Sequence, residues 1–365
     1  MKRYFKIFIM IICLLLIFSC GKKIKLPTSL PQQQERISDT TYVQISPAWT
    51  QANGDSLKNP MDVYIGYDTY VYIADTGNDR IVKMNRKGDF VAEYPIKHPI
   101  NICQDPLLRL AVVTGNNSIY FKDIFEQRPF YEVYTILDTV DTVTIIRDST
   151  VIIVGVDTIS SSYQAIACTP IPSDNHFYFT CEQTEHTYQG VYGEKHQRDR
   201  ITSFFPKMTG DSIFFMVSDT VVKKGGTLGR TINPSGITSY GTKNSFNIIF
   251  CQERGPFYIQ QIEGNYPYSL IYFPNSDIWS SYFFGLPADV TSDEFGNIYV
   301  ADQGKDKVLK FDKDGQFILS FGRFGPGYKE FKDPSGISYY DKTFYVADTG
   351  NNRILRFQLS TDIAK

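Results

Sequence analysis

The sequence has little net charge and none of the common enzyme signatures. Its 365 residues carry 37 Lys and Arg against 39 Asp and Glu, a formal net charge of −2. Without a basic block, the chain lacks the electrostatic footprint of a nucleic-acid binder. Gly-x-Ser-x-Gly, phosphate-loop, Gly-x-Gly-x-x-Gly and His-Glu-x-x-His motifs are all missing. Their absence removes the sequence support for serine hydrolases, nucleotide-binding enzymes and zinc proteases.

Cysteine and histidine are also scarce. The six cysteines form no Cys-x-x-Cys pair, which excludes zinc-ribbon and thioredoxin-like sites. Cys168 and Cys181 lie symmetrically about Asp174 and Asn175. If those two residues form a tight hairpin turn, the cysteines face each other across two strands and can form a disulfide. The alternative is two independent buried thiols.

The amino terminus has the pattern of an export signal. Three basic residues precede an uninterrupted apolar run from Ile7 to Phe18, which is too short to span a bilayer as a helix. Ile17-Phe18-Ser19-Cys20-Gly21 resembles a bacterial lipobox, which implies cleavage before Cys20 and lipidation of its thiol. An ordinary signal peptide or an uncleaved anchor is the alternative. We therefore expect a signal peptide over 1–19 and a lipidated Cys20. Residues 20–40 then form a flexible tether, and the folded body spans 41–365.

The body is rich in aromatic residues and repeats itself. With 25 Tyr and 27 Phe, the composition favours β-strands. Similar segments open at Pro60, Pro287 and Pro334, and a weaker copy opens at Pro99. Degenerate copies start near Gln164, Arg200 and Pro234. Each copy reads as four short strands joined by Gly-containing turns, a pattern typical of propeller blades of roughly 40–45 residues.

The repeat cores identify a family resemblance. Residues 72–81, 299–308 and 345–354 each follow the pattern aromatic, Val or Ile, Ala, Asp, x, Gly, ending in a basic and an aliphatic residue. They resemble NHL repeats, which implies an all-β fold with a single β-propeller of six or seven four-stranded blades. The last copy lacks a fourth strand. A strand near residues 41–45 can supply it and close the ring.

The motif contains paired charges. Asp75 occurs with Arg80, Asp302 with Lys307, and Asp348 with Arg353, whereas the Pro99 copy has lost both members at once. Joint loss indicates that the two residues act together. We predict structural ion pairs across the turn rather than catalytic groups.

Polar residues surround the repeat-opening prolines. Propellers of this kind usually bind ligands where their first strands converge on a central channel. We therefore predict a polar ring at one channel mouth, formed by Asn59, Asp62, His98, Asn101, Asn233, Asp289 and Asp333. Its oxygens would suit Ca²⁺, although no cofactor is required. The alternative is that these residues cap strands at a water-filled mouth.

Residues 134–160 do not fit a blade. Two β-branched runs at 139–146 and 150–154 flank a turn at 147–149, which predicts a long β-hairpin insertion. It either presents a partner surface or covers a neighbouring blade.

These features favour a lipoprotein of the bacterial cell envelope. We expect the outer membrane facing the periplasm, with surface exposure as an alternative. The expected role is non-catalytic binding or scaffolding of a protein or glycan partner, with no nucleic acid involved. The alternative, a calcium- or zinc-dependent lyase or lactonase using the channel, rests on the family resemblance. Zinc lyases need several channel histidines, and of the four here only His98 opens a repeat.

Overall fold

The structure is a computed structural model that describes residues 41–362. Within that range it omits 117, 126–128, 136–139, 148–149, 169–177, 191–194, 198–199, 210–211, 223–230, 243–244, 256, 264–268 and 272–275. Between 131 and 230 the description is mainly of the backbone. The predicted signal peptide, Cys20 and the tether lie outside the described residues. In the described part of the chain, no helix is long and apolar enough to cross a membrane.

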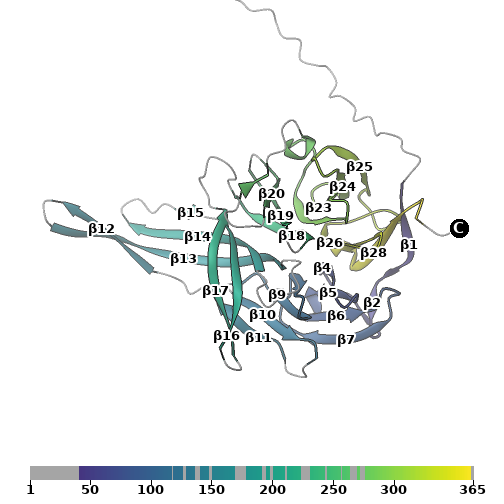
Figure 1. Cartoon of the computed structure of the whole chain (residues 1–365), viewed down its shortest axis with the longest axis horizontal. Helices are drawn as coiled ribbons and strands as arrows, with labels where there is room; N and C mark the ends of the chain where they lie inside the picture. The colour runs from purple at the N-terminus through teal and green to yellow at the C-terminus, as the bar shows by residue number, and fades with distance from the viewer. Residues whose placement is uncertain are drawn as a thin grey trace, which may run out of the picture. The chain divides into compact units, whose positions relative to one another are not determined.

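The described residues form six sheets of at least four strands, all antiparallel (Figure 1). Blade 1 comprises β4 (Pro60–Ile65), β5 (Val71–Asp75), β6 (Arg80–Met84) and β7 (Phe90–Pro95). Blade 2 comprises β8 (Asn101–Gln104), β9 (Arg109–Val113), β10 (Ser118–Asp123) and β11 (Tyr131–Thr135). Blade 3 comprises β12 (Val140–Arg147), β13 (Thr150–Cys168), β14 (Tyr178–Gly190), β15 (Lys195–Gln197), β16 (Arg200–Thr209) and β17 (Ser212–Val222).

The second half of the chain continues the series. Blade 4 comprises β18 (Pro234–Thr242), β19 (Ser245–Gln252), β20 (Ile259–Glu263) and β21 (Ser269–Leu270). Blade 5 comprises β22 (Pro287–Ser292), β23 (Ile298–Asp302), β24 (Lys307–Phe311) and β25 (Phe317–Phe321). Blade 6 comprises β26 (Pro334–Tyr340), β27 (Thr343–Asp348), β28 (Arg353–Leu359) and β1 (Tyr42–Trp49). A small hairpin pairs β2 (Gln51–Ala52) with β3 (Asp55–Ser56).

The first strands of the six blades close a ring. β4, β8, β13, β18, β22 and β26 each contact the next in this order, and β26 contacts β4. This arrangement confirms the all-β propeller, with six blades. The segment opening at Arg200 is not a blade of its own, because β16 pairs between β14 and β17 as part of blade 3. Of the two predicted numbers of blades, six and seven, six is the one found.

The ring closes through the amino-terminal strand. β1 pairs with β28 from Tyr42 opposite Leu359 to Trp49 opposite Ile354, with an irregularity between Ile45 and Trp49. The last blade thus takes its fourth strand from the start of the folded chain. This pairing covers the edge that β28 would otherwise expose to solvent.

Burial explains why the middle strands are almost wholly apolar. Every residue of β5 and β23 is buried, because both faces of these strands pack against neighbouring blades. β7 instead alternates half-buried with exposed residues, as expected for an outer strand with one face in water. Continuous apolar runs and alternating runs therefore mark the inner and outer positions within one blade.

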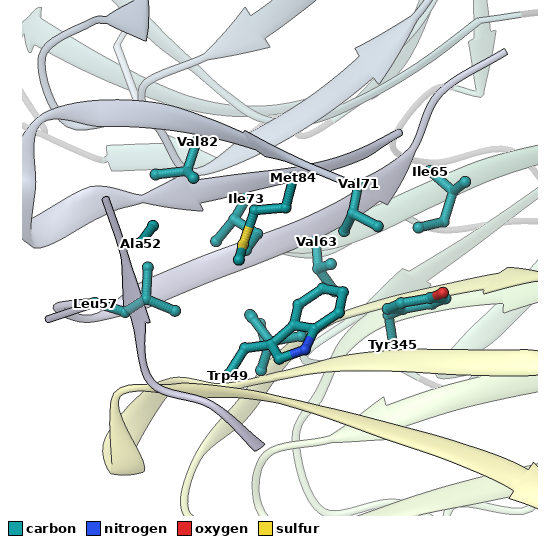
Figure 2. Close-up of a cluster of buried hydrophobic side chains, with 12 residues drawn as sticks. Trp49, Ala52, Leu57, Val63, Ile65, Val71, Ile73, Val82, Met84 and Tyr345 are labelled. Atoms are coloured by element: carbon teal, nitrogen blue, oxygen red, sulfur yellow. The ribbon is translucent and has the colours of Figure 1, made fainter. Parts of the chain in front are cut away.

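A cluster of buried side chains joins blade 1 to blade 6 (Figure 2). Trp49, which is 5% exposed, lies against Tyr345 with ring centroids 5.9 Å apart. In Figure 2 the indole lies between the strand bearing Val63 and the strand bearing Tyr345. The Arg356 guanidinium lies over the Trp49 ring, 4.6 Å from its centroid. The closing strand therefore contributes packing as well as hydrogen bonds.

Replacing Trp49 should destabilise the whole propeller. Trp49→Ala removes a buried indole at the junction, and we expect a loss of about 3–5 kcal/mol in the free energy of unfolding. Denaturant titration measures it. Phe324→Ala is the control, because Phe324 is 69% exposed and should change the free energy by less than about 0.5 kcal/mol. Equal effects of the two substitutions would contradict the role of this junction.

Candidate functional site

The six inner strands line one central cavity of about 80 Å³. Each blade contributes residues from the same part of its first strand, including Asp62 of β4, Asn101 of β8 and Asp289 of β22. Blades 3, 4 and 6 contribute mainly apolar or hydroxyl side chains to the wall. Three of the seven predicted channel residues thus come together here, and they share one position, two residues after the start of their repeat.

These three side chains join neighbouring blades. Asp62 Oδ2 accepts the backbone N–H of Ile102 in blade 2 at 2.8 Å. Asn101 Oδ1 accepts the N–H of Ile166 in blade 3 at 2.9 Å. Asp289 Oδ2 accepts the N–H of Ile337 in blade 6 at 2.9 Å. A buried backbone N–H without an acceptor costs free energy. Each of these oxygens therefore supplies the acceptor for one N–H on the inner strand of the neighbouring blade.

In blades 4 and 6, a glycine replaces the Asp or Asn two residues after the repeat proline. These glycines allow the inner strands of adjacent blades to approach closely. A Cβ at Gly336 would lie 2.6 Å from Asp62 Cα, and one at Gly236 would lie 2.6 Å from Asp289 Cα. Any larger residue would push the inner strands of adjacent blades apart. The repeat sequence Pro-Ser-Gly therefore faces the Pro-x-Asp sequence of the next blade.

The two channel carboxyls are difficult to ionise. Burial raises the pKa of Asp62 to about 7, although the N–H groups of Ile102 and Val63 oppose the shift. Burial also raises the pKa of Asp289, and the charge of Asp62 raises it further. Two ionised carboxylates in one small cavity repel each other, which disfavours the charged form of both. In the described part of the chain, no group of three or more His, Cys, Asp or Glu side chains is arranged to hold a metal ion.

The other four predicted channel residues do not line this cavity. Asn59, His98, Asn233 and Asp333 precede their prolines with φ between 48° and 52°, in the left-handed region. Their chain direction turns there into the first strand of a blade. The predicted polar ring is thus divided into two sets. The residues two positions after the proline line the cavity, whereas the residues just before the proline lie in the turn that leads into the blade.

The turn residues show a linkage that the sequence interpretation missed. The N–H of Asn59 donates to Asn352 Oδ1 at 2.7 Å, and that of His98 donates to Asp79 Oδ1 at 2.8 Å. The N–H of Asp333 donates to Asp306 Oδ1 at 3.0 Å. Each acceptor directly precedes the basic residue of the preceding blade's motif. A recurring Asp or Asn at this variable position was the available signal.

Two of the three predicted ion pairs are present. Asp75 Oδ2 lies 2.8 Å from Arg80 Nε, and Asp348 Oδ2 lies 2.6 Å from Arg353 Nε. The other oxygen of each Asp accepts a backbone N–H, from Lys58 for Asp75 and from Lys332 for Asp348. The pairs therefore hold the segment before the first strand against the end of the second strand, which is a structural role.

The third predicted ion pair is wrong. Asp302 and Lys307 face each other across β23 and β24, but no ion pair joins these two described residues. Asp302 instead accepts the N–H groups of Gly285, Leu286 and Lys305, at 2.7, 2.9 and 3.1 Å. Its oxygens are occupied by the backbone, and a lysine lacks the fork of donors by which arginine reaches such a carboxylate.

Of the two states considered for Cys168 and Cys181, a disulfide and two buried thiols, the structure has the buried thiols. In the register of β13 and β14, Cys168 lies opposite Tyr178 and Cys181 lies opposite Ala165. Both cysteines are buried thiols that do not bond to each other. The turn residues Asp174 and Asn175 lie outside the described residues. The register is shifted by three residues from the one that would place Cys168 opposite Cys181. The two cysteines therefore do not face each other across the strands.

Blade 3 carries the long hairpin. β12 pairs with β13 from Val140 opposite Thr158 to Arg147 opposite Thr150, and residues 155–168 of β13 pair with β14. In Figure 1 these paired strands extend away from the ring of inner strands. β13 is 19 residues long, and its last residues line the central cavity. One strand thus serves both as hairpin arm and as inner strand of a blade.

The inter-blade bond of Asp62 predicts a difference between two substitutions. Asp62→Ala leaves the buried N–H of Ile102 without an acceptor, so we expect a loss of about 1–3 kcal/mol in the free energy of unfolding. Asp62→Asn should lose less, because Asn101 makes the same bond in blade 2 through an amide oxygen. Urea titration distinguishes them. Equal losses would show that the acceptor at this position does not join the blades.

The raised pKa values predict how stability depends on pH. A carboxyl with a higher pKa folded than unfolded favours the folded state when protonated. Below the unfolded pKa of about 4, both states are protonated and the free energy of unfolding is unaffected. Between about pH 4 and pH 7, the unfolded chain ionises more readily than the folded one, so the free energy of unfolding decreases as the pH rises. The melting temperature should therefore rise as pH falls from 7.5 to 5. The rise should be smaller in the Asp62→Asn, Asp289→Asn double variant, by at least about 3 °C. Identical pH dependence in both proteins would contradict this assignment.

Comparisons with known proteins support the repeat family only in part. No family model matches the chain. An 86-residue stretch is 32% identical to NHL repeat-containing protein 2 of Bos taurus, covering 21% of this chain and 12% of that protein. The Homo sapiens protein of the same name is 32% identical over 85 residues, with the same shares covered. The match thus spans a small part of these relatives.

Solved structures with a related shape are distant in sequence. Virginiamycin B lyase from Staphylococcus aureus is 14% identical, with 81% of this chain and 79% of that chain covered and a TM-score of 0.39. A streptogramin B lyase is 10% identical, with 88% and 97% covered and a TM-score of 0.44. At these values the likeness transfers no chemistry. The chain is therefore a β-propeller of six blades, and part of it is similar to NHL repeat-containing proteins.

Proposed function

We propose that the protein is a non-catalytic binding or scaffolding propeller at the bacterial cell envelope. The observation that carries this proposal is the use of the channel carboxylates. Asp62 and Asp289, the acids that would serve chemistry in the central cavity, each accept one backbone N–H from an adjacent blade. Asp62 also accepts the N–H of Val63 in its own strand. Groups committed to the fold in this way favour a rigid platform, with recognition on its periphery.

The β12–β13 arm is the proposed recognition element. β12 is the end strand of its sheet, with β13 on one side. An end strand offers backbone N–H and C=O groups to which an extended segment of a partner can add as a further strand. At about 3.3 Å per residue, the 19 residues of β13 extend roughly 60 Å, more than a blade requires. This length supports a partner surface outside the ring.

The remaining parts of the proposal concern location. A lipid on Cys20 would hold the protein to a membrane, and the tether would let the propeller reach its protein or glycan partner. We propose the outer membrane, facing the periplasm. A metal-dependent lyase or lactonase would instead need a bound ion in the cavity near Asp62 and Asp289, which metal analysis of the purified protein would detect.

Shortening the arm tests the proposal directly. Residues 143–155 are replaced by Asn-Gly, which joins Thr142 to Val156, two residues that face each other across the hairpin. The lipidated protein is then recovered from its native membranes in mild detergent, and its partners and metals are quantified. We expect a stoichiometric partner with the native chain and at least a tenfold loss with the shortened arm, a binding change of about 1.4 kcal/mol or more.

A matched control separates binding from folding. Asp62→Asn changes the channel but leaves the arm intact, so it should retain the partner. Retention of the partner by the shortened arm would overturn the role of β12 and β13. Stoichiometric calcium or zinc without any partner, lost in Asp62→Asn, would overturn the non-catalytic proposal in favour of the lyase or lactonase.

A further inference from the structure

A second cavity lies between blades 5 and 6, apart from the central channel. Its volume is about 290 Å³, near the lower end of the usual range of roughly 300–1,000 Å³ for small-ligand pockets. The first strands of these blades end there, and the closing strand β1 contributes its first residue. Lining residues include Tyr42, Tyr299, Tyr339, Lys310, Asp293 and Glu294. It shares no residue with the central cavity.

Lys310 is the unusual group of this cavity. Its Nζ donates one hydrogen bond within the described residues, to the Tyr42 hydroxyl at a long 3.4 Å. The ammonium also lies 5.1 Å from the ring centroid of Tyr299 and 5.8 Å from that of Tyr42. An ammonium has three donors, so most of its hydrogen-bonding capacity is unused. Burial lowers the pKa of Lys310, although the charge of Asp293 opposes this shift.

The equivalent lysine of blade 1 shows what is missing. Lys83 occupies the same place in β6 as Lys310 does in β24, three residues after the basic residue of the motif. Its Nζ forms a 2.8 Å ion pair with Asp68 and lies over the ring of Tyr70. Blade 5 keeps the lysine and the aromatic surroundings but lacks the ion pair.

The nearest carboxylate of blade 5 is fully occupied. Asp293 Oδ1 accepts the N–H groups of Phe295 and Asn297, at 3.0 and 2.9 Å. Asp293 Oδ2 accepts the Asn297 amide at 2.7 Å and the Tyr299 hydroxyl at 2.9 Å. Four donors saturate a carboxylate. The free donors of Lys310 therefore face the cavity without an acceptor from this side chain.

The rest of the wall combines aromatic rings with groups that accept hydrogen bonds. Tyr299 and Tyr339 are nearly parallel, with an interplanar angle of 4° and centroids 6.2 Å apart. Burial, together with the neighbouring Glu294, raises the pKa of Tyr339, and Phe295 stands at the rim, 73% exposed. Tyrosine rings offer apolar faces for stacking and hydroxyls for hydrogen bonds.

The charges of the wall indicate a neutral ligand. Asp293, Glu294 and Asp362 stand against Lys310 and Lys342, so the wall carries an excess of one negative charge. An anion would meet like charges here, which is unfavourable at close range. A sugar ring has an apolar C–H face for the aromatic groups and hydroxyls that both accept from an ammonium and donate to carboxylates.

We propose that the cavity between blades 5 and 6 binds one neutral sugar ring, with Lys310 donating to a sugar hydroxyl and the partly exposed ring of Tyr339 stacking against the sugar. The site goes beyond the platform function, because it shares no residue with the arm or with the central cavity. It can therefore fail while the platform proposal stands, and the reverse also holds.

The test titrates the purified propeller with glucose, mannose, galactose and N-acetylglucosamine, with glucuronate and acetate as anionic probes. Ligand-observed NMR and calorimetry measure binding. We expect at least one neutral sugar to bind, and Lys310→Met to weaken it by at least about tenfold. Lys83→Met is the matched control, since it removes the same amine from the same place in blade 1. It should leave sugar affinity within about twofold.

A second variant guards against a folding defect. Lys313→Met lies in blade 5 on an exposed side chain and should match the native chain in melting temperature and in sugar binding. Tyr339→Ala removes one aromatic wall and should weaken the sugar as Lys310→Met does. Absence of binding by all four neutral sugars at 20 mM would overturn the proposal, as would equal binding by native chain and Lys310→Met. Binding by glucuronate and acetate alone would overturn it too, in favour of an anion site.

Discussion

The propeller depends on how its inner strands satisfy their backbone at the channel. At the channel, the inner strand of each blade has no neighbouring strand of its own sheet on one side, so its outward N–H groups need other acceptors. In blade 3 this holds for the inner end of β13, because β12 pairs with the outer end of that strand. Asp62, Asn101 and Asp289 supply acceptors from the adjacent blade. A second set of acceptors, Asp79 among them, holds the turn before the next blade. The ring is thus joined at two levels.

This constraint shapes the interpretation of function. Acidic residues near a channel suggest chemistry, yet here their oxygens are acceptors for the fold, and burial raises the pKa of Asp62 and Asp289. A carboxyl needed to join blades is poorly placed to change partners during a reaction. Recognition is more easily added outside the ring. Blade 3 extends β13 beyond the blade, so that the arm proposed for recognition and an inner strand are one continuous element.

Comparison among the repeats reveals where one blade has departed from the others. Lys83 and Lys310 occupy the same place in their blades, yet one is paired with a carboxylate and the other is not. The carboxylate near Lys310 is held by four donors from its own turn. The consequence is a cavity with an unsatisfied ammonium, beside the strand that closes the ring. Comparing equivalent positions in different blades thus helps to distinguish side chains that stabilise the fold from those that do not.

Local patterns in the sequence by themselves determined the repeats, the four-strand blades, the motif pairs Asp75–Arg80 and Asp348–Arg353, and a closing strand before Pro60. These follow from turn chemistry and apolar runs, which act over a few residues. The sequence could not determine the number of blades, because the segment at Arg200 resembles a repeat start but pairs within blade 3. It also misplaced the Cys168–Cys181 register and the Asp302–Lys307 pair.

Only the tertiary structure decided these points. A register depends on which strand a blade packs against, and an acceptor's partner depends on which N–H groups the turn brings within reach. The four residues before the prolines and the three after them are close in sequence. Ring closure turns the chain between them, so Asp62 faces the cavity while Asn59 lies at the turn. The cavity between blades 5 and 6 likewise arises from three segments, near residues 42, 299 and 339, that meet because the first strand closes the last blade.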